Sequence, residues 1–215
     1  MSRKPNRSRA TLLAVLAALS LASGCGALKR CAYAGIGRDE WQQPERVVAD
    51  LGLAPGALVA DLGAGGGYFT FRLARAVGPE GHVYAVDVDE DMTAHIAKRA
   101  AAEGLANVSS VLAAPADARL LVPVDLFFTS NTYHHLEDRT AYFQGVRERM
   151  LRPGGKLAIV EYRPEASSHA TARETIEAEL AAAGFQLAKS FDYLEQQHFL
   201  VFSAASADTV EAMSR

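Results

Sequence analysis

The stretch VADLGAGGGYFTFRLA, from Val59 to Ala74, joins an apolar run to an amphipathic one through four glycines. The apolar run has the length of a buried strand, and the amphipathic run has the period of a helix. In doubly wound α/β folds, a glycine turn between a strand and a helix presents backbone N–H groups where no Cβ blocks a ligand. The stretch therefore predicts a nucleotide-like ligand site at the end of a strand.

Strands and helices alternate along the rest of the chain. Short apolar runs predict strands at 57–63, 82–88, 107–113, 124–130, 156–162, 185–194 and 196–204. Amphipathic segments, ended mostly by glycine or proline, predict helices at 44–53, 66–78, 90–103, 137–151 and 171–183. This alternation is typical of a parallel sheet covered on both faces, but the last two strands lie too close for a crossover helix. We therefore expect a Rossmann-like, doubly wound seven-stranded α/β sheet, mostly parallel, with one antiparallel strand near the C-terminus.

The spacing of the glycines distinguishes between two known cofactor-binding motifs. The dinucleotide pattern G-x-G-x-x-G needs a third glycine where Tyr68 or Thr70 stands, which disfavours a nicotinamide-dependent reductase. The pattern D-x-G-x-G-x-G fits instead. Its residues are Asp61, Gly63, Gly65 and Gly67.

This pattern and strand order resemble the class I S-adenosylmethionine-dependent methyltransferases, from about Trp41 to Ser203. RVVADLGLAPGALVADLGAGGGYF and LRPGGKLAIVE also resemble small-molecule methyltransferases of the ubiquinone and menaquinone biosynthesis type. The resemblance implies S-adenosylmethionine as the cofactor, with the glycine turn under its amino-acid end. It also implies that Asp87 accepts hydrogen bonds from the two ribose hydroxyls and that Asp117 contacts the adenine amine. Asn131, after the fourth strand, is a further cofactor-binding candidate.

The fourth strand ends in TSNTYHHLEDR, which lies where the methyl acceptor is expected. This segment lacks both prolines of the N-P-P-aromatic box that amine methyltransferases commonly carry. His134 or His135 could act as a general base for a hydroxyl or an acidic carbon. The alternative is that they only pack or orient the loop. Glu161 and Tyr162, at the end of the fifth strand, are expected to face the same pocket.

The first 24 residues have the features of an export signal, with four basic residues ahead of an apolar run from Ala10 to Ala22. Small residues lead directly to Cys25, which resembles the lipobox of bacterial lipoproteins. We expect a signal peptide at 1–24, lipidation of Cys25, a tether at 25–40, the methyltransferase domain at 41–203 and a flexible tail at 204–215. This predicts a membrane-anchored lipoprotein facing the periplasm. The alternatives are an uncleaved anchor with the domain facing the cytoplasm, and a transit peptide.

The charge and the cysteine content of the chain exclude some classes of partner and site. The chain of 215 residues has a net charge of −3, and its basic residues are scattered, so nucleic acid is not expected as a partner. Its two cysteines, Cys25 and Cys31, precede the domain, so neither a zinc site nor a disulfide framework is expected there. We expect methylation of a small or lipid-associated molecule. The alternative is an exported, non-catalytic binding module, because this cofactor is made in the cytoplasm.

Overall fold

The computed structural model describes residues 37–205. The expected signal peptide, Cys25, most of the expected tether and most of the expected tail lie outside the described residues. Within residues 37–205, every helix is too short or too polar to cross a membrane.

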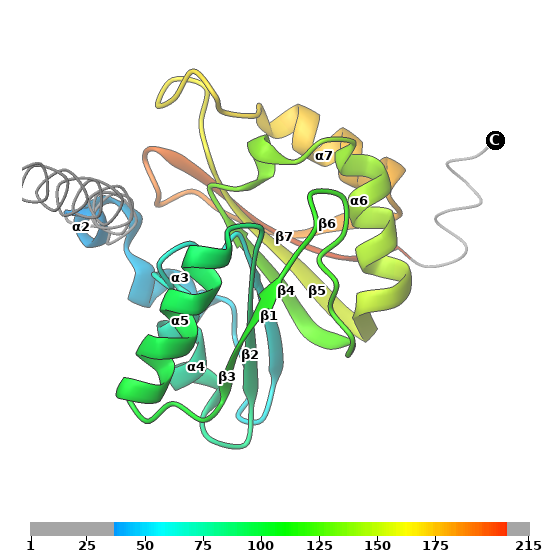
Figure 1. Ribbon diagram of the computed structural model, residues 1–215. Coiled ribbons are helices and arrows are strands. Elements are labelled where there is room, and N and C mark those ends of the chain that lie inside the picture. Colours follow the sequence, from blue (N-terminus) through cyan, green and yellow to red (C-terminus); the bar gives the residue numbers. More distant parts are fainter. Residues whose placement is uncertain (1–36, 206–215) are drawn as a thin grey trace, which may run out of the picture.

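A seven-stranded sheet in the order β3-β2-β1-β4-β5-β7-β6 forms the centre of the domain (Figure 1). Its strands are β1 (Leu58–Leu62), β2 (His82–Asp87), β3 (Val108–Leu112), β4 (Val124–Ser130), β5 (Leu151–Tyr162), β6 (Phe185–Phe191) and β7 (Gln197–Ala204). Strands β1 to β5 pair in parallel, and β7 runs antiparallel to both of its neighbours. The predicted sheet, with its single antiparallel strand near the C-terminus, is confirmed.

Helices cover both faces of this sheet. They are α2 (Arg38–Gln42), α3 (Pro44–Asp50), α4 (Thr70–Val77), α5 (Glu90–Ala102), α6 (Arg139–Gly145), α7 (Arg173–Ala182), the 3₁₀ turn η1 (Tyr133–His135) and the π-helical turn η2 (Val146–Met150). Neighbouring strand residues alternate between two cores, as Phe127 and Phe128 do. Phe127 packs beneath α6, η2 and α7, whereas Phe128 packs on the face that α3 and α4 cover. Both faces of the central strands are therefore buried, as a doubly wound sheet requires.

Two elements differ from the sequence prediction. Helix α2 begins at Arg38, inside the range expected to be a tether. The helix expected at 137–151 is α6 followed by η2, and β5 begins at Leu151 instead of Lys156. Leu151 pairs with Val124 ahead of a bulge in this ladder, so the strand continues through a Pro-Gly-Gly segment that has no strand-like pattern.

The glycine turn after β1 is packed from two sides, and this fixes its path. Gly63 has a φ of +72° and lies so close to Thr132, after β4, that an added Cβ would overlap the Thr132 side chain. Gly67 has a φ of +82°, and a Cβ there would overlap the ring of Phe71 in α4. The turn therefore tolerates only glycine at these two positions without movement of its neighbours.

This packing predicts the cost of a methyl group at Gly63. We expect Gly63→Ala to lower the free energy of unfolding by about 2–4 kcal/mol, because backbone strain adds to overpacking. Gly154→Ala is the matched control, since Gly154 has a φ of +78° but nothing within 4 Å of an added Cβ. Gly154→Ala is expected to lower the free energy of unfolding by about 1 kcal/mol, which is the backbone strain alone. Urea unfolding measures both, and equal losses would contradict the close packing.

Candidate functional site

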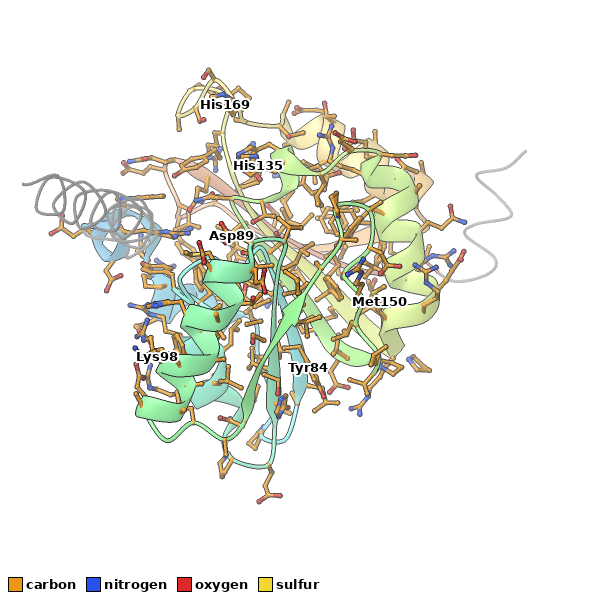
Figure 2. The ribbon with its side chains drawn as sticks, viewed as in Figure 1. Tyr84, Asp89, Lys98, His135, Met150 and His169 are labelled. Carbon is orange, nitrogen blue, oxygen red and sulfur yellow. The ribbon has the colours of Figure 1, made fainter. Side chains whose placement is uncertain are left out.

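A cavity of about 820 Å³ opens at the carboxyl ends of β1, β2, β4 and β5. The lining residues on which the argument depends are Asp61, Gly65, Asp87, Asn131, His134 and Tyr162. Figure 2 shows Asp89, at the start of α5, and His135, in η1, at this same end of the sheet. The expected position of the site, at the carboxyl edge of a parallel sheet, matches this cavity.

Asp87 ends β2 and holds the glycine turn. Its Oδ2 accepts a hydrogen bond from the Gly65 amide at 2.7 Å, and its Oδ1 accepts one from the Asp89 amide at 2.9 Å. A carboxylate offers about four acceptor positions, so each oxygen keeps capacity for one more donor. The side chain lines the cavity, and a ligand with two neighbouring hydroxyls matches this remaining capacity.

Asp61, in β1, is a second carboxylate on the cavity wall, and it is only 3% exposed. Burial is the main cause that raises the pKa of Asp61 to about 6. The hydrogen bond from Thr70 opposes this rise, and the negative charge of Asp87 contributes to it. The Thr70 hydroxyl donates to Asp61 Oδ2 at 2.6 Å. A buried carboxylate with this pKa gains stability as an anion when a cation lies beside it.

Helix α2, which the sequence analysis did not predict as a helix, forms a wall of the cavity. Arg38 lies over the ring of Tyr68 at 4.1 Å, and its Nη2 donates to Ser130 Oγ at 3.3 Å. Burial lowers the pKa of Arg38. The Tyr68 hydroxyl donates to Asp39 at 2.6 Å, which ties α2 to the glycine turn. The acidic pair Asp39-Glu40 in the first turn was the available sequence signal for this short helix.

Trp41, also in α2, stacks on Tyr162 at the end of β5. Their ring centroids are 5.9 Å apart with an angle of 25° between the planes, and both residues line the cavity. Chain segments about 120 residues apart therefore supply one flat aromatic wall.

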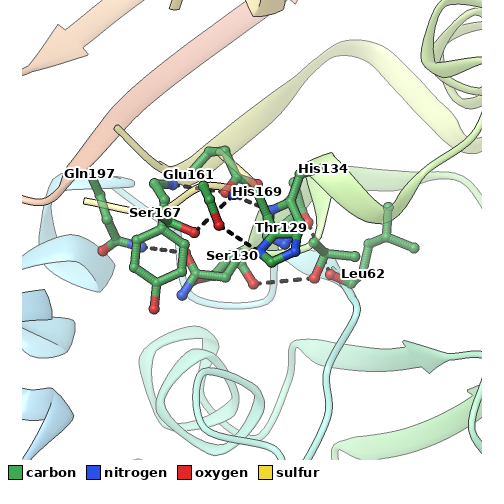
Figure 3. Close-up of polar contacts among 12 residues, drawn as sticks. Leu62, Thr129, Ser130, His134, Glu161, Ser167, His169 and Gln197 are labelled. Atoms are coloured by element: carbon green, nitrogen blue, oxygen red, sulfur yellow. Dashed lines mark hydrogen bonds and ion pairs between the residues drawn. The ribbon is translucent and has the colours of Figure 1, made fainter. Parts of the chain in front are cut away.

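His134 lines the cavity and forms a buried pair with Glu161, which was expected to face the cavity but is not among its lining residues (Figure 3). His134 Nδ1 lies 2.9 Å from Glu161 Oε1, and the two side chains are 10% and 0% exposed. Glu161 Oε1 also accepts from the Tyr162 amide at 2.8 Å, whereas Oε2 has no partner within residues 37–205. The ring of His135 lies 4.1 Å from that of His134, and burial lowers the pKa of His135, with the neighbouring His134 adding to this.

The other expected site residues fall into two groups. Gly63 and Gly65 line the cavity, as does Asn131, whose Oδ1 accepts a hydrogen bond from Gln197. Gly67 does not line the cavity but packs against α4. Asp117 is also outside the lining.

Asp117 does not line the cavity, and its expected adenine contact stays a prediction. Its carboxylate accepts from the Arg119 amide at 2.7 Å and lies 3.5 Å from Arg149. Ala113, Ala114 and Pro115 line the cavity in its place. A short antiparallel bridge joins Ala114 and Asp117.

Comparisons with known proteins agree with this arrangement. A family model described as a methyltransferase domain matches residues 53–205. The arsenite methyltransferase of Halobacterium salinarum is 33% identical over 122 residues, which cover 52% of this chain and 31% of the relative. The demethylmenaquinone methyltransferase of Staphylococcus aureus is 30% identical over 125 residues, which cover 54% of this chain and 48% of the relative. The chain thus spans less than half the length of these two curated relatives.

Solved structures share the whole fold. A SAM dependent methyltransferase from Aquifex aeolicus superposes with a TM-score of 0.72 at 25% identity, over 78% of this chain and 93% of that one. The magnesium protoporphyrin IX methyltransferase of Synechocystis PCC 6803 with bound SAM has the same fold, with a TM-score of 0.61 at 23% identity, over 80% and 83% of the two chains. The chain therefore belongs to the methyltransferase domain family and has the fold of the S-adenosylmethionine-dependent methyltransferases.

Proposed function

We propose that the protein transfers a methyl group from S-adenosylmethionine to a small or lipid-associated molecule. The observation that carries this proposal is Asp87, which ends β2 inside the cavity, holds the glycine turn and retains one free acceptor position on each oxygen. The two ribose hydroxyls of the cofactor are a matching pair of donors. The family, the fold and the cavity volume of about 820 Å³ support the same conclusion.

The cavity residues fit this cofactor in charge as well as in shape. Asp61 offers a buried carboxylate to the positively charged amino-acid end, and the glycine turn lets the backbone approach closely. When bound, S-adenosylmethionine supplies a methyl group that its sulfonium already activates. The task of the chain is then mainly to position the acceptor and to exclude water, to which Trp41 and Tyr162 contribute their stacked wall.

The lipid-associated part of the proposal depends on the N-terminus. Cys25 follows a basic and apolar segment that resembles a lipoprotein signal. Lipidation there would hold the domain at a membrane surface, because acyl chains contribute about 0.8 kcal/mol per buried CH₂. An acceptor dissolved in that membrane would then be within reach.

The alternative function is an exported binding module that keeps the fold but not the reaction. It is favoured by the conflict between predicted export and a cytoplasmic cofactor. Transfer of labelled methyl from the donor into a membrane extract separates the two, because the module would bind the donor without turnover.

Cofactor binding at Asp87 can be measured directly. We expect Asp87→Ala to weaken the binding of S-adenosylhomocysteine by roughly 100-fold or more, because two charge-assisted hydrogen bonds are lost. Asp91→Ala, on the exposed first turn of α5, is the matched control and should bind like the wild type. Calorimetry reports both affinities, and thermal unfolding checks that each variant folds. Unchanged affinity in the Asp87 variant would contradict the proposed cofactor site.

Asp61 makes binding of the donor dependent on pH. Since its pKa in the free protein is about 6, Asp61 is mostly ionised above pH 6 and protonated below it. A positively charged donor favours the ionised form, so its affinity should fall by up to about tenfold per pH unit as the pH drops below about 6. Asp61→Asn should bind more weakly at neutral pH and lack this dependence. Parallel pH profiles for the wild type and the variant, measured by calorimetry, would count against this role.

The lipidation proposal has its own test. In a bacterial host fed a labelled fatty acid, the full chain should take up label and partition with membranes, because Cys25 would be the modified residue. Cys25→Ser should lose the label, whereas Cys31→Ser is the matched control and should keep it. A chain that stays unlabelled with Met1 intact would refute lipidation.

A further inference from the structure

The pair of His134 and Glu161 points to the chemistry of the methyl acceptor. This inference rests on the proposed function, because it concerns the same cavity. The pair lines the cavity through His134, and its role is separate from those of Asp61 and Asp87 on the cofactor side.

The backbone that carries His134 is fixed by its neighbour. Tyr133 is fully buried, stacks on Phe143 at 5.5 Å and donates its hydroxyl to Glu179 Oε2 at 2.6 Å. Arg139 holds the same glutamate with two hydrogen bonds of 2.7 Å each. The loop after β4 is therefore anchored to α7, and His134 has little freedom to leave the cavity wall.

The contact with Glu161 selects one form of the imidazole. A carboxylate only accepts hydrogen bonds, so the proton of neutral His134 must sit on Nδ1, at 2.9 Å from Glu161 Oε1. Nε2 then carries a lone pair, and it is the ring nitrogen left for a molecule in the cavity. The same orientation of an imidazole by a buried carboxylate underlies general-base catalysis in hydrolases.

Glu161 also presents a buried carboxylate to His134. Its side chain is fully buried in β5, and Oε2 has no hydrogen-bond partner within the described residues. A carboxylate that is incompletely satisfied in a region of low dielectric strongly stabilises a positive charge beside it. The ring of His135 lies 4.1 Å away, and burial lowers its pKa, with the neighbouring His134 adding to this.

We propose that His134 is the general base for a methyl acceptor that carries a phenolic or enolic hydroxyl, and that Glu161 is its positioning residue. The O–H bond of the acceptor breaks, and its proton goes to His134 Nε2. The electron pair left on oxygen forms the bond to the methyl carbon, and the pair of the broken S–CH₃ bond remains on sulfur. The imidazolium that results is held by Glu161 and later returns the proton to solvent.

The acidity of the hydroxyl decides between acceptor classes. A phenol has a pKa near 10 and an ordinary imidazole one near 6.5, a gap of about three to four orders of magnitude that a positioned base can overcome. An aliphatic alcohol is far less acidic, so the same base would be inadequate. A neutral amine already has a free electron pair and needs no base to attack. The stacked wall of Trp41 and Tyr162 gives a flat, unsaturated acceptor a surface on which to lie.

The first arm of the test is the proton position on His134. In the full chain labelled with ¹⁵N-histidine and saturated with S-adenosylhomocysteine, ring-nitrogen spectra should show Nδ1 protonated and Nε2 bare at slightly alkaline pH. Glu161→Gln should lose this single form, because an amide can also donate to Nδ1. Glu148→Gln, on an exposed site in η2, is the matched control and should retain it. Protonation of Nε2 in the wild type would overturn the proposal.

The second arm follows proton transfer with 4-nitrophenol, whose anion absorbs visible light while the neutral phenol does not. At a pH where the free probe is mostly neutral, the wild-type complex with S-adenosylhomocysteine should generate the anion band. His134→Gln should lose the band, and Glu161→Gln should reduce it several-fold. His82→Gln is the control, since His82 begins β2 at the opposite end of the sheet. Absence of the band with the wild type, or its persistence in His134→Gln, would overturn the proposal.

Calorimetry with S-adenosylhomocysteine distinguishes this outcome from failure of the proposed function. Normal binding by a wild type that shows no anion band refutes the base and leaves the cofactor site standing. Failure of the wild type to bind S-adenosylhomocysteine refutes the proposed function itself.

Discussion

The hydrogen bond from the Gly65 amide to the Asp87 carboxylate, at 2.7 Å, joins the turn after β1 to the end of β2. It fixes the glycine turn in the one place where backbone and carboxylate can face the same ligand. On the other side of this turn, Gly63 packs against Thr132. The glycine turn therefore also positions the loop after β4. Three strand ends therefore meet around one cavity, and the roles assigned to the remaining residues depend on this junction.

Charge is distributed unevenly over the cavity. Asp61 and Asp87 supply two carboxylates to the cavity wall at the ends of β1 and β2, where the raised pKa of Asp61 reflects both burial and its neighbour. Glu161 supplies a third carboxylate behind His134, outside the cavity lining; its Oε1 contacts His134, and its Oε2 has no partner within the described residues. Anions that are each costly to bury become stable when a positive group arrives. This arrangement suits a cationic donor at one end and the transient protonation of a histidine at the other.

Features set by local pattern could be predicted from the sequence. The glycine turn, Asp87 at a strand end and the alternation of strands and helices each depend on residues close together along the chain. The partner of His134 is 27 positions away, and the stacking of Trp41 on Tyr162 spans a longer distance still. Asp117 follows the third strand as expected, but its carboxylate accepts from the Arg119 amide and it is not among the lining residues. Such tertiary contacts leave no periodic signal. The short helix α2 was not predicted for a different reason, because five residues are too few to show a helical period.

A crystal structure of the full chain with S-adenosylhomocysteine tests the central claim most directly. The account predicts that the ligand occupies the cavity at the ends of β1, β2 and β4, with both ribose hydroxyls on Asp87 and the amino-acid end over the glycine turn beside Asp61. A ligand bound elsewhere, or one whose ribose makes no contact with Asp87, would contradict it.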